Sequence, residues 1–403
     1  MPLVVFCAGT SWDGLAGSDR HLATALMAHT RLLWVDPPVS ALTPARYRGG
    51  AGRRLVPRLS VVDTGMTRLT PVAPPGWTRP GVLLVTWPLV RAQVRWALRR
   101  IGAPLPRAVV ACSLDDVLSG WPRSVRTVLY GTDDYVAGAG LMRLGERSLV
   151  RSERRQLAAA DLVVAVSPVL AQRWTARGAR RVALLPNGCD AAAGAQVDSA
   201  PAPVGLPLGL PLGLPVGLPG DRPGDRPVVG LVGQLSDRID IELLAAVAAL
   251  DCTLLIVGPY RAGWEAERFA ALVSRPNVIH VGAVPATALP SYLGAIDVGL
   301  TPYRDTPFNR ASFPLKTLEY LAAGRPVVST DLPATRWLST DLVSTARTPA
   351  EFAAAVRHTL PGARDPRLVA RRRSFAGQHS WPRRAAEFAR LIGLSETSTE
   401  DAL

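Results

Sequence analysis

The segment "FPLKTLEYLAAGRPVVST", residues 313–330, predicts a helix followed by a buried strand. Apolar residues recur at helical spacing up to Gly324, a residue type that commonly ends helices, and the β-branched run "RPVVST" comes next. A strand directly after an amphipathic helix is the repeating unit of parallel α/β sheets. The segment also contains Lys316, the only lysine among the 46 lysines and arginines of the chain.

The same alternation of β-branched runs and helical patterns continues through both halves of the chain. In the first half it predicts strands at 3–9, 31–36, 82–87, 108–113, 127–131, 162–167 and 182–187, and helices at 18–29 and 143–159. In the second half it predicts strands at 227–233, 252–258, 277–282, 298–303, 325–330 and 341–345, and helices at 239–250, 263–274, 286–295, 315–323 and 349–360. This pattern predicts two Rossmann-like domains that face each other across a cleft, with ligands at the carboxyl ends of the strands.

One segment interrupts this alternation. Residues 204–227 read "VGLPLGLPLGLPVGLPGDRPGDRP", and a proline at every fourth position is incompatible with a helix or a central strand. We therefore expect a low-complexity linker over 191–226, between an N-terminal domain at 1–190 and a C-terminal domain at 227–380. Residues 381–403 are expected to form a helix that crosses back to the N-terminal domain, followed by a tail.

The net charge of +14 over 403 residues is not taken as a sign of nucleic-acid binding. The basic residues stand singly among apolar ones instead of in blocks with interleaved aromatics. Anionic lipid head groups or phosphorylated substrates remain compatible with this charge. No signal-peptide pattern and no apolar run long enough for a bilayer span are evident, so we expect a cytoplasmic protein with at most peripheral contact at the inner face of the membrane.

The start of the helix that contains Lys316 is a predicted anion site. Pro314 suits its first turn, and the free backbone N–H groups and the helix dipole favour an anion there. Lys316 adds a cation where the helix itself is not stabilised by one, which indicates a function. Glu319, on the same face, is placed to accept hydrogen bonds from vicinal hydroxyls, as a nucleoside diphosphate would offer. The alternative is a surface ion pair between these two residues.

Several stretches resemble the GT-B glycosyltransferases, in particular the family-4-like group that includes teichuronic acid and exopolysaccharide transferases. "NVIHVGAVPATALPSYLGAIDVGLTPY", "PLKTLEYLAAGRPVVST" and "VVGLVGQLSDRIDIELL" resemble the C-terminal donor domain. "LYGTDDYVAG", "AADLVVAVSPVLAQRW" and "VALLPNGCD" resemble parts of the N-terminal domain. The resemblance covers most of the chain outside 191–226.

The resemblance implies contacts to a nucleotide-sugar donor. The residues it assigns are Gly233 and Arg238 near the diphosphate, Lys316 on the same diphosphate, Glu319 on the ribose hydroxyls, and the strand end from Val281 to Val284 near the base. It implies no metal and no other cofactor, because helix ends and basic side chains neutralise the leaving nucleotide; the five scattered histidines agree with this.

The chain departs from the family pattern at one position. Many retaining relatives have a glutamate eight residues before the one that matches Glu319, where it touches the donor sugar, and here that position is Ala311. Asn309 or Ser312 is the candidate replacement.

In the N-terminal half, "AGTSWDGLAGSDRHLATAL" predicts a strand, a glycine-rich loop and a helix. Gly14 and Gly17 would let the chain turn toward the cleft, and Asp13, Ser18 or His21 would then meet the acceptor. The alternative is a tight turn without a ligand.

Asp133 and Asp134 follow a short apolar strand in "LYGTDDYVAG". A carboxylate at the carboxyl end of a strand can act as a general base on an acceptor hydroxyl, and Asp134 is preferred over Asp133. The alternative is a helix cap. Arg143, Arg147, Arg151 and Arg155 share one helix face, which either contacts lipid phosphates or is simply solvated.

Together these observations predict a glycosyltransferase that moves a sugar from a nucleotide-sugar donor to a hydroxyl acceptor, on a lipid-linked or envelope glycan. Two alternatives are a non-hydrolysing nucleotide-sugar epimerase and a catalytically silent nucleotide- or glycan-binding partner of another transferase. Turnover without an acceptor would indicate the first alternative, and nucleotide binding without turnover the second.

Overall fold

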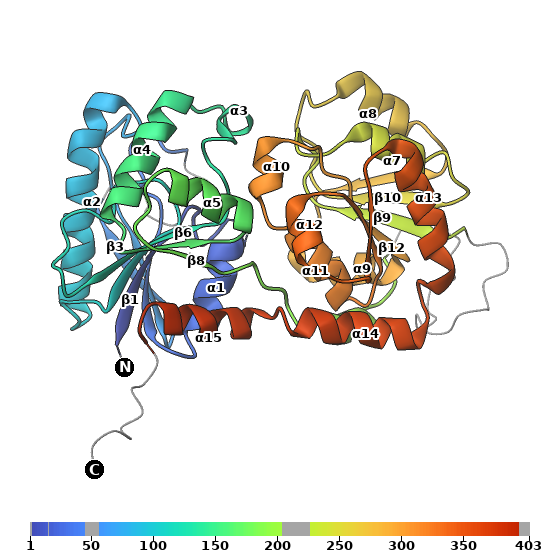
Figure 1. Cartoon of the computed structure of the whole chain (residues 1–403). Coiled ribbons are helices and arrows are strands. Elements are labelled where there is room, and N and C mark those ends of the chain that lie inside the picture. The colour runs from blue at the N-terminus through green and yellow to red at the C-terminus, as the bar shows by residue number, and fades with distance from the viewer. Residues whose placement is uncertain (1, 15, 45–55, 204–225, 395–403) are drawn as a thin grey trace, which may run out of the picture. The chain divides into compact units, whose positions relative to one another are not determined.

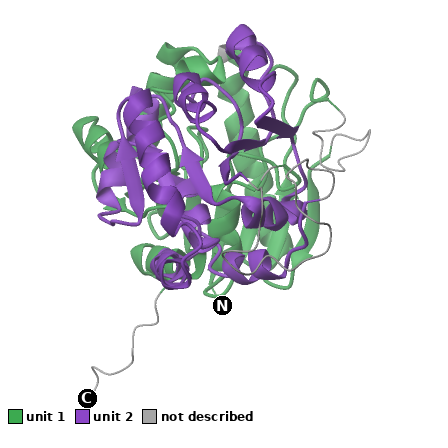
Figure 2. Ribbon diagram, turned by 90° about the vertical axis from the view of Figure 1, so that its right-hand side faces the viewer, with its two compact units in different colours: residues 1–187, 381–403 green, residues 188–380 purple. Residues whose placement is uncertain are grey.

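The computed structural model describes residues 2–14, 16–44, 56–203 and 226–394, and divides into two compact units (Figure 1). Unit 1 contains residues 1–187 and 381–403, and unit 2 contains residues 188–380 (Figure 2). Most of the predicted linker, residues 204–225, lies outside the described residues. The part of it at 193–199 differs from the prediction, because these residues form helix α6 (Ala193–Ser199), which packs on α9 (Leu289–Ala295) in unit 2.

Unit 1 is built on an eight-stranded sheet in the order β3-β4-β2-β1-β5-β6-β7-β8. Its strands are β1 (Leu3–Cys7), β2 (Arg31–Val35), β3 (Arg58–Asp63), β4 (Met66–Thr70), β5 (Ala108–Ala111), β6 (Arg126–Gly131), β7 (Leu162–Ala165) and β8 (Val182–Leu184). All neighbouring strands are parallel except β3, which pairs antiparallel with β4. The hairpin of β3 and β4 was not predicted.

The helices of unit 1 connect these strands. They are α1 (Ser18–Leu26), α2 (Pro80–Arg100), α3 (Ala139–Met142), α4 (Glu146–Ala159), α5 (Pro168–Ala176) and α15 (Trp381–Leu391). The predicted crossing of the last helix is confirmed, since α15 packs on α1 and the ring of His21 stacks on Trp381 with centroids 5.4 Å apart. Phe388 of α15 also meets Tyr130 of β6.

The strand predicted at 82–87 is wrong, because these residues belong to α2. The run "VLLVTW" is apolar on every side, so its helical period cannot be read from hydropathy alone. Thr86 and Trp87 are buried, whereas Leu84 and Val85 face solvent. The helix therefore has an apolar side that no part of the described chain covers.

Unit 2 is built on a six-stranded, fully parallel sheet in the order β11-β10-β9-β12-β13-β14. The strands are β9 (Val228–Val232), β10 (Thr253–Val257), β11 (Val278–Gly282), β12 (Val298–Thr301), β13 (Val327–Thr330) and β14 (Val343–Ala346), which confirms all six predicted ones. Beside α6 and α9, its α-helices are α7 (Ile241–Val247), α8 (Ala266–Val273), α10 (Pro307–Ala311), α11 (Leu315–Ala322), α12 (Pro333–Trp337), α13 (Pro349–Thr359) and α14 (Pro366–Gly377). The predicted class, α/β with two Rossmann-like domains, is confirmed.

Candidate functional site

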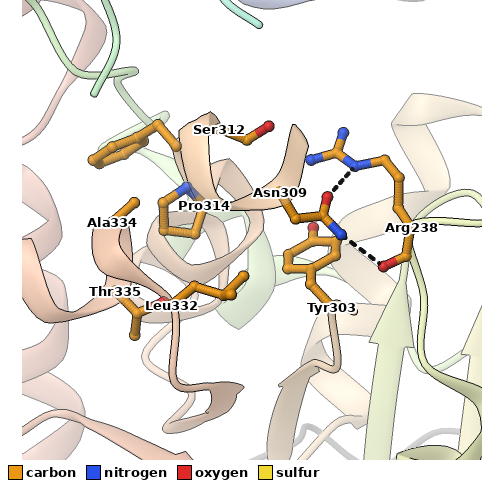
Figure 3. Close-up of a pocket in the computed structure, with 9 residues that line it drawn as sticks. Arg238, Tyr303, Asn309, Ser312, Pro314, Leu332, Ala334 and Thr335 are labelled. Atoms are coloured by element: carbon orange, nitrogen blue, oxygen red, sulfur yellow. Dashed lines mark hydrogen bonds between the residues drawn. The ribbon is translucent and has the colours of Figure 1, made fainter. Parts of the chain in front are cut away.

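A small pocket in unit 2 opens where the loops after β9 and β12 meet the start of α11 (Figure 3). It encloses about 260 Å³ of free space, the open mouth included. Its walls are Arg238, Tyr303, Asn309, Ser312, Phe313, Pro314, Leu332, Ala334 and Thr335. Three of the predicted donor residues, Arg238, Asn309 and Ser312, are thus brought together here. This is the carboxyl edge of a parallel sheet, where ligands of open α/β folds bind.

Arg238 is held rigidly at the edge of this pocket. Its guanidinium lies over the rings of Tyr303 and Phe308, 5.3 Å and 5.0 Å from their centroids, and its Nε donates to Asn309 Oδ1 at 3.0 Å. Within the described ranges, its two terminal nitrogens have no hydrogen-bond partner. A guanidinium fixed by stacking and by Nε, with both terminal amino groups available, is well suited to a phosphate.

The side-chain amide of Asn309 forms hydrogen bonds within the protein. Its amide nitrogen donates to the carbonyl oxygens of Arg238 at 3.0 Å and of Arg304 at 2.9 Å, and the side chain is only 3% exposed (Figure 3). Helix α10, which carries it, is capped by Thr306, whose hydroxyl accepts from the backbone N–H of Asn309. Its amide oxygen and nitrogen are thus engaged in positioning Arg238, and its contact with the sugar stays a prediction.

Ala311 and Ser312 end α10. Ala311 is fully buried, so its methyl group lies away from any ligand, and the Ser312 hydroxyl donates to the carbonyl oxygen of Phe308 at 3.1 Å. Ser312 nevertheless lines the pocket. Both predicted replacements for the missing glutamate thus line the pocket, and both are buried with their polar groups engaged by the protein.

Lys316 and Glu319 form an ion pair on α11, with 2.6 Å between Nζ and Oε2. Their side chains are 29% and 30% exposed, so both the functional and the ion-pair interpretation of the sequence remain compatible with the geometry. Burial alone would lower the pKa of Lys316, but the Glu319 carboxylate more than offsets this and the pKa lies above its ordinary value. Pro314 is the residue before the helix, one position earlier than expected, and lines the pocket.

The carboxyl ends of β9 and β10 approach each other very closely. A Cβ on Gly258, whose φ is +146°, would lie 1.9 Å from the carbonyl oxygen of Gly233, so only glycine fits there. Gly233 itself has open space where a Cβ would lie. The predicted base contacts, Val281 and Val284, are half-buried at the end of the edge strand β11 and do not line the pocket, and neither do Gly233, Lys316 and Glu319.

In unit 1 the two predicted bases, Asp133 and Asp134, have different environments. Asp134 is completely buried and pairs with Arg173 of α5, while its other oxygen accepts from the backbone N–H of Ala137 at 2.9 Å. This is a turn contact and an ion pair, and not the helix cap of the alternative interpretation, because α3 begins at Ala139 with Gly138 before it and no capping side chain. Asp133 is half-buried, so the preference for Asp134 over Asp133 as a base is not supported.

The predicted acceptor residues are also used within unit 1. Asp13 pairs with Arg68 at 2.8 Å, and this hydrogen bond holds the pKa of its carboxyl below the ordinary value. Gly14 closes a turn with its N–H on Ser11 O, and Gly17 precedes α1. His21 packs against Trp381, as described above. The region therefore resembles a built turn more than an open binding loop, and acceptor contacts there stay a prediction.

Sequence reasoning missed two acids at the same edge of this sheet. Asp19 of α1 is buried and accepts from the backbone N–H of Gly9, and burial raises its pKa. Asp115, after β5, accepts from the Ser113 hydroxyl at 2.9 Å, and burial raises its pKa to about 6. Nothing in the local sequence indicates that Asp19 is buried and Asp115 half-buried.

Among the described residues, no group of three or more histidine, cysteine, aspartate or glutamate side chains is arranged to hold a metal ion. The predicted independence from metal ions is not tested by this arrangement. None of the helices within the described ranges is long and apolar enough to span a bilayer.

Residues 226–361 match the family described as Glycosyl transferases group 1. The putative teichuronic acid biosynthesis glycosyltransferase TuaH of Bacillus subtilis (strain 168) is 35% identical over 159 residues, which are 38% of this chain and 40% of that protein. The match thus spans two fifths of the relative's length.

Solved structures similar to this one cover the whole chain. Sucrose-phosphate synthase from Thermosynechococcus elongatus has a TM-score of 0.69 at 18% identity, with 98% of each chain covered. HepE of Anabaena, solved in complex with UDP and glucose, has a TM-score of 0.63 at 16% identity, with 98% of this chain and all of that chain covered. At this identity the likeness shows the fold, which is GT-B.

Proposed function

We propose that the chain transfers a sugar from a nucleotide-sugar donor to a hydroxyl acceptor, because residues 226–361 match the family described as Glycosyl transferases group 1 and the fold is GT-B. The observation that carries the proposal is Arg238. It is fixed over Tyr303 and Phe308 at the carboxyl edge of the unit 2 sheet, with its terminal nitrogens open toward the pocket.

The donor diphosphate would be bound by Arg238 and Lys316 in this proposal. Lys316 now pairs with Glu319, and a diphosphate, which carries more charge than one carboxylate, would take over the ammonium group. Glu319 would then be free to accept hydrogen bonds from the ribose hydroxyls. Because the two side chains are about 70% covered, the exchange would occur without fully desolvating either charge.

Breaking the bond between the sugar and the diphosphate leaves negative charge on the departing nucleotide. Arg238, Lys316 and the backbone N–H groups at the start of α11 would stabilise this charge. This arrangement supports a mechanism without a resident metal or other cofactor. A base that removes the proton of the acceptor hydroxyl remains a prediction in unit 1, and Asp133 is its remaining candidate.

We further propose that the acceptor is a lipid-linked or envelope glycan and that the protein works at the inner face of the membrane. Teichuronic acid biosynthesis is stated for the relative from B. subtilis, and the net charge of +14 suits a surface of anionic lipids.

The test is a binding panel of UDP-, GDP- and dTDP-sugars, followed by transfer assays with the donor that binds. We expect one nucleotide class to raise the unfolding temperature, and the Arg238→Gln variant to lose this shift while an Arg268→Gln control, on the exposed pair with Glu242, keeps it. No shift with any sugar nucleotide would refute the proposal.

The transfer assay also separates the two alternatives. Sugar-nucleotide turnover that needs no acceptor would indicate the epimerase, although none of the relatives reported above is one. Binding without turnover would indicate a silent binding partner, the alternative that the buried Ala311 keeps open.

A further inference from the structure

Helix α2 has an apolar side that faces solvent instead of the core. The exposed positions of its first three turns recur with helical spacing and are Gly81, Leu84, Val85, Pro88, Leu89 and Ala92. Leu84 is 75% exposed and Val85 61%. Single exposed apolar side chains are ordinary, whereas a continuous apolar stripe marks a binding surface.

The same side of α2 becomes basic toward its end. Arg99 and Arg100 are exposed there, and the whole helix contains no aspartate or glutamate. The solvent-facing side of α2 is therefore apolar over its first three turns and positively charged at its last turn. A helix with this division of character is typical of those that lie in the plane of a membrane interface.

Helix α4 lies next to α2 and adds charge to the same surface. Asp116 joins them, at 3.4 Å from Arg91 of α2 and 3.9 Å from Arg155 of α4. The exposed side of α4 carries Arg147, Arg151 and Arg154, and none of these pairs with an acid in the part of the chain that the structure describes. Val150 is 37% exposed between these arginines, and Leu144, just before α4, is 53% exposed.

We propose that this surface, the α2–α4 face (Leu84, Val85 and Leu89 with Arg99, Arg100, Arg147, Arg151 and Arg154), docks unit 1 on a membrane rich in anionic lipids. The apolar side chains would enter the boundary between head groups and hydrocarbon, and the arginines would contact lipid phosphates. The combination explains why an apolar stripe is left uncovered and why the arginines beside it have no acidic partner.

Other occupants fit this surface less well. A nucleic acid offers phosphates but no hydrocarbon for Leu84 and Val85. A second copy of the chain, paired through the same face, would place the unpaired arginines of both copies against each other. A membrane satisfies both parts of the surface at once.

Sedimentation with lipid vesicles tests the proposal, because it needs no donor or acceptor and is independent of the proposed transfer reaction. We expect the full-length protein to bind vesicles of phosphatidylcholine with phosphatidylglycerol, and to bind phosphatidylcholine vesicles weakly. The double variant Arg147→Glu/Arg151→Glu should lower the partition coefficient roughly 30-fold or more, since each basic residue near the surface contributes about a factor of five. Leu84→Gln/Val85→Gln should lower it about tenfold or more.

Matched controls carry the same changes elsewhere. Arg357→Glu/Arg367→Glu alters the charge equally on exposed positions of unit 2, and Val61→Gln replaces a side chain that is 79% exposed on β3. Both should bind vesicles like the parent protein. The proposal would be overturned if the protein bound neutral vesicles equally well, or if the control variants lost as much binding. It would also be overturned if the protein bound no vesicles and instead formed a dimer that Leu84→Gln/Val85→Gln dissociates.

Discussion

Two ion pairs that follow strand ends, one in each unit, differ in what they leave available to a ligand. The Lys316–Glu319 pair of unit 2 is about one third exposed on both sides, whereas Asp134 of unit 1 is completely buried beneath Arg173. An exposed pair loses little when a ligand replaces one partner, because water and the ligand solvate the charge that is released. A buried pair cannot be opened without stranding a charge. The same local signal, an acid or base near a sheet edge, therefore leaves a pair that the proposed function can use in unit 2 and a structural contact in unit 1.

The largest expected effect concerns the buried pair. Asp134→Ala removes a fully buried carboxylate that pairs with Arg173 and accepts from the Ala137 N–H, so we expect unit 1 to lose about 3 kcal/mol of stability from these two hydrogen bonds. Denaturant unfolding followed by circular dichroism measures this. Asp133→Ala, the neighbouring control, should be within about 0.5 kcal/mol of the parent protein. Equal stability of the two variants would place Asp134 outside the structural role assigned here.

Asp115, an acid without a basic partner in the described ranges, should have the opposite effect: its removal should stabilise the protein. Burial of Asp115 raises its pKa to about 6. A carboxyl whose folded pKa exceeds its unfolded pKa destabilises the protein as the pH rises through that interval. Asp115→Asn should therefore gain about 2–3 kcal/mol at pH 7.

That gain has a pH signature which separates it from simple repacking. It should shrink as the pH falls from about 6 toward 4, because the carboxyl of the folded parent protein then becomes protonated. Unfolding curves of both proteins across this range measure the difference. A gain that stays constant with pH would show that Asp115 titrates normally.

The exposed pair should affect ligand binding more than stability. Lys316→Ala removes one charge-assisted contact to the diphosphate, and we expect the Kd for the sugar nucleotide to rise about tenfold or more. Stability should change by less than about 1 kcal/mol. Isothermal titration measures the affinity. Arg371→Ala, which breaks an exposed pair with Asp341 on another part of unit 2, is the matched control and should bind the donor normally.

The smallest expected effect is that of chelation. If Arg238 and Lys316 neutralise the leaving nucleotide, transfer in excess EDTA should equal transfer in its absence. Activity that falls with EDTA and returns with added Mg²⁺ or Mn²⁺ would assign this neutralisation to a metal ion instead.

Much of unit 2 could be predicted from sequence because its four central strands are buried on both faces and separated by regular helices. All six strands follow from β-branched runs such as "CTLLIVG", and Lys316 is visible as the only lysine. In unit 1, α2 was taken for a strand because its exposed side is as apolar as its buried side. The β3–β4 hairpin could not be predicted because the buried Arg68 interrupts the apolar pattern of β4. The acids that pair with Arg68, Asp13 and Asp36, are distant in sequence.

The site was harder to predict than the fold. The sequence identified Arg238, Asn309 and Ser312 as neighbours of a ligand, and the pocket joins them. It could not show that Asn309 is occupied by the backbone of Arg238 and Arg304, or that Asp134 faces an arginine 39 residues further along. Such partners depend on how distant loops meet, which spacing along the chain does not encode.

A crystal structure with the selected sugar nucleotide tests the central claim most directly. The account predicts that the diphosphate lies within hydrogen-bond distance of the terminal nitrogens of Arg238 and of Lys316 Nζ, with Glu319 released from the lysine and turned to the ribose. A nucleotide bound elsewhere, or one bound while the Lys316–Glu319 pair stays closed, would contradict it.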